Sequence, residues 1–418
     1  MMKTLKFKLH KLSKEQYLAL KDFSHYSNNL YNYSLYIAKE YFKETGKYIG
    51  LNKLIKEVGG NENYKLLPAQ SAQQIVRLLD KNFRSFFALL RKKQSGTYND
   101  KINIPKFKKK GDTFNIIYTF QSFRITKGFI TLNSSNEYKK INPVKLKIPF
   151  TFDIDGKVKQ IIIKPYNKGQ YFNCYLQYEE NTQKEELCLN KDKYLSIDLG
   201  LNNFASVIDT DGHSFILNGK SLKSYNIWYN KRKAKLKSEL KKKNKKEWSK
   251  QLQLLEEKRK WFIDNYFNQF VSTLIKHCIK YQIGNIVIGY NETWKSGINL
   301  GKRNNQNFIY IPFLNFKRKL ENKCNENEIK FIQVEESYTS KCSALDLEPV
   351  KKQDSYLGNR IKRGLFKTSK GQLINADING ALNILRKVIG DDFIQPIAGL
   401  MFNPIKSSYN FNKNFQSF

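Results

Sequence analysis

Cysteine, histidine and long apolar runs are scarce in this 418-residue chain. Its five cysteines lie far apart and form no C-x-x-C pair. This odd, scattered set argues against a disulfide scaffold and favours a reducing, cytoplasmic setting. No stretch approaches the roughly 20 consecutive apolar residues that span a bilayer. The first ten residues alternate Lys with apolar residues and are not expected to be a secretory signal.

Acidic residues are also few. The chain has 74 Lys and Arg against 37 Asp and Glu, a formal net charge of +37. Hydrophobic residues make up 40%, which is enough for packed cores and excludes a wholly disordered basic tail. A chain this basic needs a polyanionic partner. Nucleic acid is the expected partner, and an anionic membrane surface is the weaker alternative. The length suggests two or three domains at roughly 100–200 residues each.

The first half of the sequence predicts helices and then short strands. Residues 3–9 alternate with period two, as in a half-buried strand. A helix is expected from Ser13, with Gln16 completing a capping box, and a second helix from Pro68 to about residue 93. Short strand-like runs then follow, which suggests a small antiparallel sheet or barrel. These runs are Phe114–Phe120, Phe129–Leu132, Val144–Phe150, Val158–Pro165 and Tyr171–Tyr178.

The pattern changes after a polar linker at Glu179–Lys193. Strands and helices alternate, which predicts an α/β sheet with a parallel portion. Residues 337–374 are expected to be irregular, and residues beyond Pro396 a loose tail. The predicted strands are Tyr194–Ile197, Phe204–Ile208, Asn285–Tyr290 and Ile329–Val334, and the predicted helices are 221–280, Pro312–Asn325 and Ala376–Val388.

Carboxylates at the ends of apolar strands are the first candidates for chemistry. Asp198 ends one strand, Glu335 and Glu336 end another, and Asp377 lies in the first turn of a helix. Singly, each has a structural explanation: the helix dipole favours Asp377, and Glu335 and Glu336 suit a solvated strand end. Together, three carboxylates in a strongly basic α/β protein fit phosphodiester hydrolysis with two Mg²⁺ ions.

Six segments in a fixed order make the chain resemble TnpB, the RNA-guided nuclease of insertion sequences and a relative of type V CRISPR effectors and Fanzors. The resemblance spans about residues 1–390. The segments are Leu67–Gln74 with the helix up to Phe87, Ile104–Lys108, Ser196–Phe204, Ile286–Tyr290, Tyr338–Lys341 and Asn375–Leu385.

The resemblance implies an α/β multidomain fold. A wedge β-barrel with a helical recognition insertion precedes an RNase H-like RuvC nuclease. The expected division is a first wedge strand at 1–10, helical recognition domain at 11–95, wedge barrel at 96–185, RuvC at 186–336 and 375–392, target-nucleic-acid-binding insertion at 337–374 and flexible tail at 393–418.

The same resemblance assigns the catalytic carboxylates. Asp198 corresponds to the first RuvC aspartate and Asp377 to the last. The middle glutamate is expected after the strand Ile286–Ile288, where this chain has Gly289. Glu336 is then the expected replacement and Glu335 the second choice. Because side chains alternate along a strand, only one of the two can face the metal ions. Glu292 is a third possibility, in a loop.

Relatives also carry a four-cysteine zinc ribbon, whereas only Cys342 remains between residues 337 and 374. One thiol cannot make a four-ligand site, so no zinc is expected and packing should hold this segment. The expected cofactors are two Mg²⁺ ions, held by Asp198, Glu336 and Asp377.

Phosphate contacts are expected from three basic segments. Tyr26, Tyr31, Tyr33 and Phe83 could stack on bases; for Phe83 a place in the core is the better explanation, and the tyrosines stay open. The residues expected to bind nucleic acid are Arg77, Lys81, Arg84, Lys106, Lys108, Lys109, Lys231, Arg232 and Lys235.

The resulting prediction is a transposon-encoded, RNA-guided DNA endonuclease of prokaryotic cytoplasm, associated with the nucleoid when bound to DNA. Its partners would be a guide RNA derived from the transposon end and double-stranded target DNA, cut beside a short adjacent motif. Two alternatives stay open: a nuclease-inactive, RNA-guided DNA-binding repressor, motivated by Gly289, and an RNA-free resolvase or transposase. The oligomeric state is left open.

Overall fold

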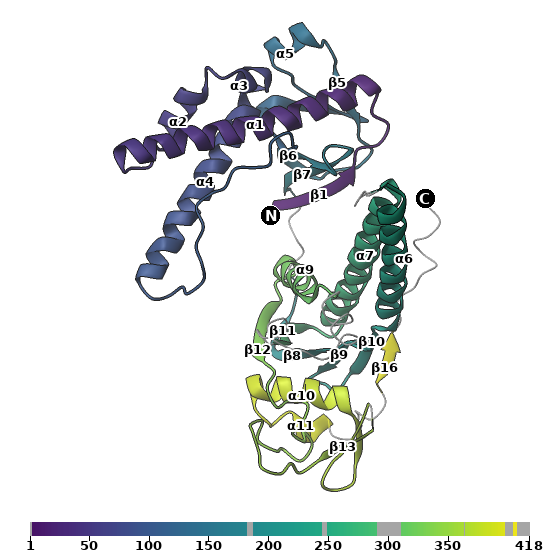
Figure 1. Ribbon diagram of the computed structural model, residues 1–418. Coiled ribbons are helices and arrows are strands. Elements are labelled where there is room, and N and C mark those ends of the chain that lie inside the picture. The colour runs from purple at the N-terminus through teal and green to yellow at the C-terminus, as the bar shows by residue number, and fades with distance from the viewer. Residues whose placement is uncertain are drawn as a thin grey trace. The chain divides into compact units, whose positions relative to one another are not determined.

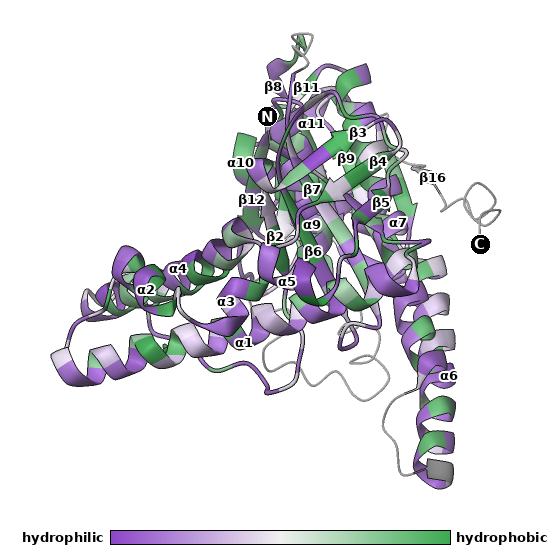
Figure 2. Ribbon diagram, turned by 90° about the horizontal axis from the view of Figure 1, so that it is seen from above, coloured by the Kyte–Doolittle hydropathy of each residue, from purple (hydrophilic) through white to green (hydrophobic). Residues whose placement is uncertain are grey.

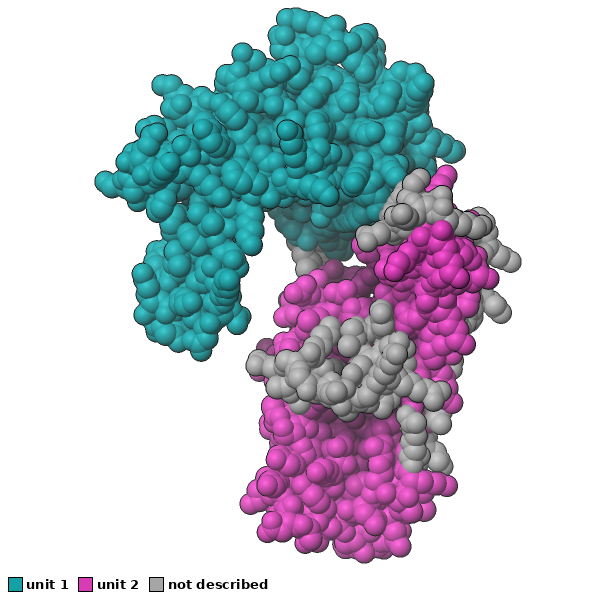
Figure 3. Space-filling model, viewed as in Figure 1, with its two compact units in different colours: residues 1–184 teal, residues 185–418 magenta. Residues whose placement is uncertain are grey.

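The computed structural model describes residues 2–181, 187–244, 249–290, 311–362, 364–397 and 404–407. The chain divides into two compact units, Met1–Lys184 and Glu185–Phe418 (Figure 3). Each unit has its own hydrophobic core. None of the helices within these ranges is long and apolar enough to cross a membrane.

The helices of the first unit follow the predicted pattern closely. Helix α1 begins where Ser13 and Gln16 form the predicted capping box. α4 begins directly after Pro68, and its apolar face packs on α1. Two short helices between them are not evident from the sequence pattern. The helices are α1 (Lys14–Thr45), α2 (Leu51–Val58), α3 (Glu62–Leu66), α4 (Ala69–Gln94), α5 (Asn136–Ile141) and the 3-10 turn η1 (Phe120–Ser122).

The strands of the first unit form two antiparallel sheets, in the orders β1-β7-β6-β2 and β3-β4-β5. The expected β-barrel is wrong in this respect: over the described residues neither sheet closes on itself. Closure would need the edge strands β1 and β2 to pair, and they do not. The strands are β1 (Met2–Lys8), β2 (Ile116–Thr119), β3 (Phe123–Thr126), β4 (Phe129–Leu132), β5 (Leu146–Pro149), β6 (Gly156–Tyr166) and β7 (Tyr171–Glu180).

The second unit is built on a mixed sheet in the order β12-β11-β8-β9-β10-β16. β8, β11 and β12 are parallel, and β9 is antiparallel to β8. The predicted α/β fold is therefore confirmed. The strands are β8 (Asn190–Leu199), β9 (Asn203–Asp209), β10 (Ser214–Asn218), β11 (Ile283–Tyr290), β12 (Lys330–Glu335) and β16 (Ile405–Ser407).

Helices cover both faces of this sheet (Figure 1). Leu195 and Ile197 of β8 pack into a core with α7 and α9. The alternate residues, Ser196 and Asp198, face α10, and Ser196 Oγ donates to the Ala381 carbonyl oxygen. The helices are α6 (Lys220–Asn244), α7 (Lys250–Lys280), α9 (Phe313–Glu326), α10 (Ala376–Ile389) and α11 (Ile394–Ile397).

Three sequence predictions need correction here. The linker is shorter than expected, because β7 extends to Glu180 and β8 starts at Asn190. Residues 337–374 are not wholly irregular, since they contain β13 (Asn359–Lys362), β14 (Leu365–Lys367) and most of β15 (Leu373–Asn375). The expected loose tail includes β16, which pairs with β10. Strands of three or four residues carry too little alternation to be recognised in a sequence.

A buried carboxylate ties the sheet to α7. Asp209 is fully buried and accepts hydrogen bonds from His213 Nδ1 at 3.1 Å and His277 Nε2 at 2.8 Å. It also accepts from the backbone N–H groups of Asp211 and His213. These partners belong to the β9–β10 turn and to α7, so one side chain at the end of β9 fixes two other segments.

Asp209→Ala should therefore lower the free energy of unfolding by about 2 kcal/mol or more, because its hydrogen-bond donors lose a charged acceptor. Urea unfolding of the purified variant measures this. Asp211→Ala is the matched control: its ion pair with Lys193 is half-exposed and worth less than about 1 kcal/mol. Equal losses in the two variants would contradict the assigned role of Asp209.

Candidate active site

The carboxyl ends of β8, β11 and β12 lie at one edge of the sheet, because the three strands are parallel. Ile197 is level with Ile288, so Asp198 is level with Gly289, which in turn pairs with Val334. Val334 packs with Val287 and Ile384 on the α10 side of the sheet. Two residues further along, Glu336 is expected on that same side.

The two adjacent glutamates indeed point to different partners. Glu336 lies close enough for its charge to act on Asp198. Glu335 is 64% exposed and accepts a hydrogen bond from the Ser337 N–H at 3.1 Å, with Lys387 Nζ 3.5 Å away. Hydrogen bonds from Ser337 and the Lys387 charge lower the pKa of Glu335. Of this pair, the structure brings Glu336 to Asp198 and holds Glu335 on Ser337.

Asp377 comes to the same place from the start of α10. Asn375 caps the helix by accepting from the N–H groups of Asp377 and Ile378. The Asp377 carboxylate accepts from Asn203 Nδ2 at 2.6 Å and from an Arg360 guanidinium nitrogen at 2.9 Å. The sequence prediction missed both donors. Asn203 had a signal, since it lies within the segment Ser196–Phe204, whereas Arg360 lies in a segment predicted to be irregular.

Asp198 lies at the centre of this group. Burial and the negative charges of Glu336 and Asp377 raise its pKa well above the usual range, and Arg360 opposes the shift. Its carboxylate approaches α10 at a glycine: a Cβ added to Gly380 would lie 2.7 Å from Asp198 Oδ2. Any larger residue at 380 would therefore displace the carboxylate.

The three carboxylates suit a hard cation in ligand type, since Mg²⁺ prefers carboxylate oxygen. Burial is the main cause of the raised pKa of Asp198, and the charges of Glu336 and Asp377 add to it; a cation would offset both effects. As placed, however, no three His, Cys, Asp or Glu side chains in the described part of the chain are close enough together to coordinate an ion. Asp377 is instead held by Asn203 and Arg360.

Gly289 occupies the position where a glutamate was expected. A Cβ added there would lie 2.6 Å from Ile384 Cδ1 and 3.4 Å from Glu336 Cβ. A side chain at 289 would therefore begin beside that of Glu336, so positions 289 and 336 place their side chains at the same part of the sheet edge. Glu292, the third possibility, lies outside the described residues.

Carboxylates within the segment 337–374 cross-link that segment by hydrogen bonds. Glu348 is 2% exposed and accepts from the N–H groups of Ser343 and Leu357. Asp346 accepts from the hydroxyls of Ser343 and Ser369. Packing, as expected from the sequence, is thus only part of the explanation. Cys342 is buried, and its thiol lies 3.5 Å from the Pro349 carbonyl oxygen.

The residues predicted to bind nucleic acid are spread over three elements. On α4, Arg77, Lys81 and Arg84 are exposed at helical spacing, and Arg84 pairs with the buried Asp80 at 2.7 Å. Figure 2 shows hydrophilic residues recurring along α6. The exposed residues also include Lys106, Lys109, Lys231, Arg232 and Lys235.

Lys108 differs from these neighbours. Its ammonium group lies 3.8 Å from the Phe114 ring centroid and 4.5 Å from that of Tyr31, and burial lowers its pKa. Phe83 is 4% exposed and Tyr31 3%, so both are core residues, whereas Tyr26 and Tyr33 are partly buried against that core.

Two family models match the chain. Residues 175–295 match OrfB_IS605, described as a probable transposase, and residues 313–384 match the Cas12f1-like TNB domain. The first match covers β8, β9 and β11 with Asp198, and the second covers Glu336 and Asp377. The chain therefore has the sequence features of TnpB-type proteins along the elements that build the site.

Particular relatives agree with this class. The chain is 29% identical over 208 residues to the TnpB-like protein ORF457 of Acidianus two-tailed virus, a match to 48% of this chain and 42% of that protein. The matched region thus spans less than half the length of this curated relative. Cas12f1, solved by cryo-EM with its guide RNA and target DNA, has the same fold, with a TM-score of 0.62 at 16% identity, covering 89% of this chain and 83% of that one. The resemblance to the TnpB family is confirmed.

Proposed function

We propose that this protein is an RNA-guided DNA endonuclease whose active site consists of Asp198, Glu336 and Asp377. The observation that carries the proposal is their gathering from β8, β12 and α10, with the charges of Glu336 and Asp377 acting on Asp198. Glu335 is the second choice for the glutamate. The second unit would be the RuvC nuclease, at 186–336 and 375–392, with 337–374 as the target-binding insertion.

In this proposal the carboxylates, the residues that orient them and Gly380 have separate roles. Asp198, Glu336 and Asp377 would hold two Mg²⁺ ions, which supply charge stabilisation for hydrolysis of a phosphodiester bond by water. Asn203 and Arg360 orient Asp377. Gly380 allows Asp198 to approach α10.

The proposed partners are a guide RNA derived from the transposon end and double-stranded DNA. The net charge of +37 and the exposed basic residues of α4, the 106–109 loop and α6 support a large polyanionic partner. The complex of Cas12f1 with guide RNA and target DNA supports the same pair of partners. Guide pairing would select the target, and the protein would read a short adjacent motif. The first unit would supply the recognition helices, at 11–95, and the wedge, at 1–10 and 96–185. The setting would be prokaryotic cytoplasm.

Plasmid cleavage tests the proposal. The protein is co-expressed with its flanking RNA, and cleavage is assayed with Mg²⁺, with EDTA and with Asp198→Asn. We expect guide-dependent cutting that EDTA abolishes and that Asp198→Asn lowers about a thousandfold, because the ions lose a charged ligand. Guide-dependent DNA binding should persist in the variant. Cleavage by protein freed of RNA would contradict the guide requirement.

A nuclease-inactive repressor is the second candidate, and two observations favour it. Gly289 replaces the expected glutamate, and Arg360 pairs with Asp377 at 2.9 Å. Guide-dependent DNA binding by the wild-type protein without any cleavage in Mg²⁺ would support this candidate and refute the nuclease.

A further inference from the structure

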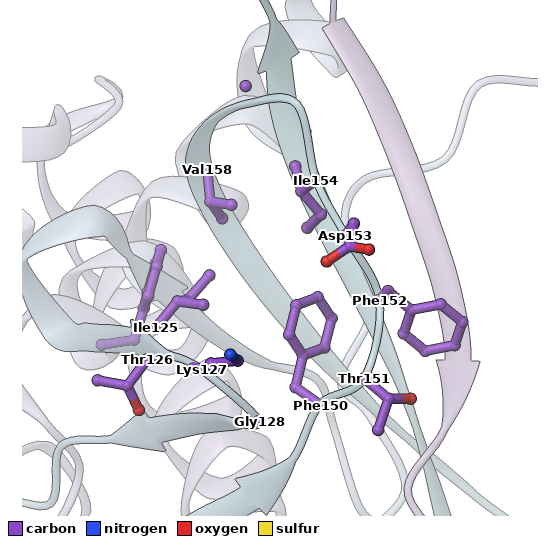
Figure 4. A pocket seen from close by; sticks show the side chains of 12 residues that line it. Ile125, Thr126, Lys127, Gly128, Phe150, Thr151, Phe152, Asp153, Ile154 and Val158 are labelled. Atoms are coloured by element: carbon purple, nitrogen blue, oxygen red, sulfur yellow. The ribbon is translucent and has the colours of Figure 1, made fainter.

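The first unit contains a hollow that the proposed cleavage chemistry does not use (Figure 4). Its volume is about 650 Å³, within the usual range for small-ligand pockets. It lies between the β3–β4 turn and the segment 150–155, which joins β5 to β6. We call it the Phe152 pocket. Its lining residues include Ile125, Thr126, Lys127, Phe150, Phe152 and Asp153.

Two phenyl rings form one wall of the Phe152 pocket. Phe150 is buried, whereas Phe152 is 44% exposed, and their ring centroids lie 5.7 Å apart. Figure 4 shows both rings on the segment that joins β5 to β6. Phe7 of β1 supports them from behind, 5.6 Å from Phe150 and 5.3 Å from Phe152. The exposed ring is therefore packed between two neighbouring rings at the edge of the pocket.

The rim of the pocket is polar and charged. Thr126, Lys127, Thr151 and Asp153 line it and are exposed. Residues 121–160, which form most of the pocket, contain eight Lys or Arg and three Asp or Glu. Such a rim offers no hydrogen bond or ion pair to an apolar protein side chain. A nucleotide would use all of it, because its base stacks on a ring, its edge forms hydrogen bonds and its phosphate meets a lysine.

We propose that the Phe152 pocket binds one unpaired nucleobase with an exocyclic amino group, from the guide RNA or from a single strand of target DNA. The base stacks on Phe152, its amino group donates to the Asp153 carboxylate, and its phosphate lies beside Lys127. The inference rests on the proposed function only for the identity of the nucleic acid. The pocket would add base preference to binding that is otherwise electrostatic.

Short labelled oligonucleotides test this on the full-length protein freed of RNA. The probes are oligomers of about six nucleotides, a typical site size for single-strand binding. They are oligocytidine, oligouridine, oligodeoxycytidine and an abasic oligomer of equal charge, titrated at raised salt, where phosphate contacts contribute less. The variants are Phe152→Ala, Asp153→Asn and, as control, Ile279→Ala, because Ile279 is 38% exposed on α7, outside the elements proposed to bind nucleic acid.

We expect oligocytidine to bind more tightly than the abasic and uridine oligomers. Phe152→Ala should weaken oligocytidine binding about 5- to 100-fold, the usual loss for one stacked base, and leave abasic binding unchanged. Asp153→Asn should reduce the preference for cytidine over uridine. The tighter of the ribo- and deoxyribo-oligomers identifies RNA or DNA as the source of the base.

Unchanged oligocytidine binding in Phe152→Ala, or an equal loss in Ile279→Ala, would overturn the pocket proposal. Plasmid cleavage by the same preparations separates this result from the proposed function. If the wild-type protein cleaves the plasmid and Phe152→Ala binds oligocytidine normally, only the pocket proposal is refuted. If Phe152→Ala binds oligocytidine more weakly but the wild-type protein does not cleave, only the proposed nuclease activity is refuted.

Discussion

Glu336→Ala is expected to lower guided DNA cleavage about a thousandfold or more, whereas Glu335→Ala retains it. Glu336 faces Asp198 and would be a ligand of the metal ions, and loss of such a ligand removes several kcal/mol of transition-state stabilisation. Glu335 is mostly exposed and is engaged by Ser337 and Lys387. Plasmid cleavage rates of the two variants, with equal guide-dependent DNA binding, measure the difference.

The geometry at Gly289 offers a rescue of the Glu336→Ala variant. A side chain at 289 would start beside Glu336 Cβ, and its only close contact below 3 Å is Ile384 Cδ1. Adding Gly289→Glu and Ile384→Val to Glu336→Ala restores a carboxylate from β11 and removes that methyl group. We expect at least about a tenfold recovery of cleavage. Gly289→Gln in the same background is the neutral control. If Glu335→Ala abolished cleavage and Glu336→Ala retained it, Glu335 and not Glu336 would be the metal-binding glutamate.

Gly380→Ala should separate stability from activity. The added Cβ would lie 2.7 Å from Asp198 Oδ2, the far end of a side chain that can rotate away. Alanine also favours a helix over glycine by about 1 kcal/mol, so α10 should stay folded. The Asp198 carboxylate would nevertheless be displaced, and an error of about 1 Å in a reacting group can cost a hundredfold in rate. We therefore expect a melting temperature equal to or slightly above that of the wild type and cleavage lowered about 10- to 100-fold.

Gly60→Ala is the matched control for this substitution. A Cβ at Gly60 has no atom within 4 Å, and the residue lies far along the chain from the site. Its cleavage rate should equal that of the wild type. Wild-type cleavage by Gly380→Ala would show that Asp198 does not need its close approach to α10.

Much of this fold follows from local patterns. The capping box at Ser13, the Pro68 helix start and the strand before Asp198 lie where the sequence predicts. Strand alternation also limits the metal-facing glutamate to one of Glu335 and Glu336, and the register with β11 favours the second.

The remaining features depend on contacts between distant segments. The hydrogen bonds that Arg360 and Asn203 donate to Asp377 form only when β9, α10 and the 337–374 segment come together. Lys108 looks like its basic neighbours in the sequence, yet Tyr31 and Phe114 surround its ammonium group. The β-barrel prediction was wrong because strand spacing predicts antiparallel pairing but not whether the edges meet.

The origin of the three carboxylates has a consequence during protein synthesis. Asp198, Glu336 and Asp377 come from β8, the end of β12 and the first turn of α10. The last of them leaves the ribosome long after the first, and it reaches the others only when α10 packs on the sheet. A nascent chain that has already released Asp198 and Glu336 therefore still lacks Asp377, so the group of three carboxylates is completed only when nearly the whole chain has been made.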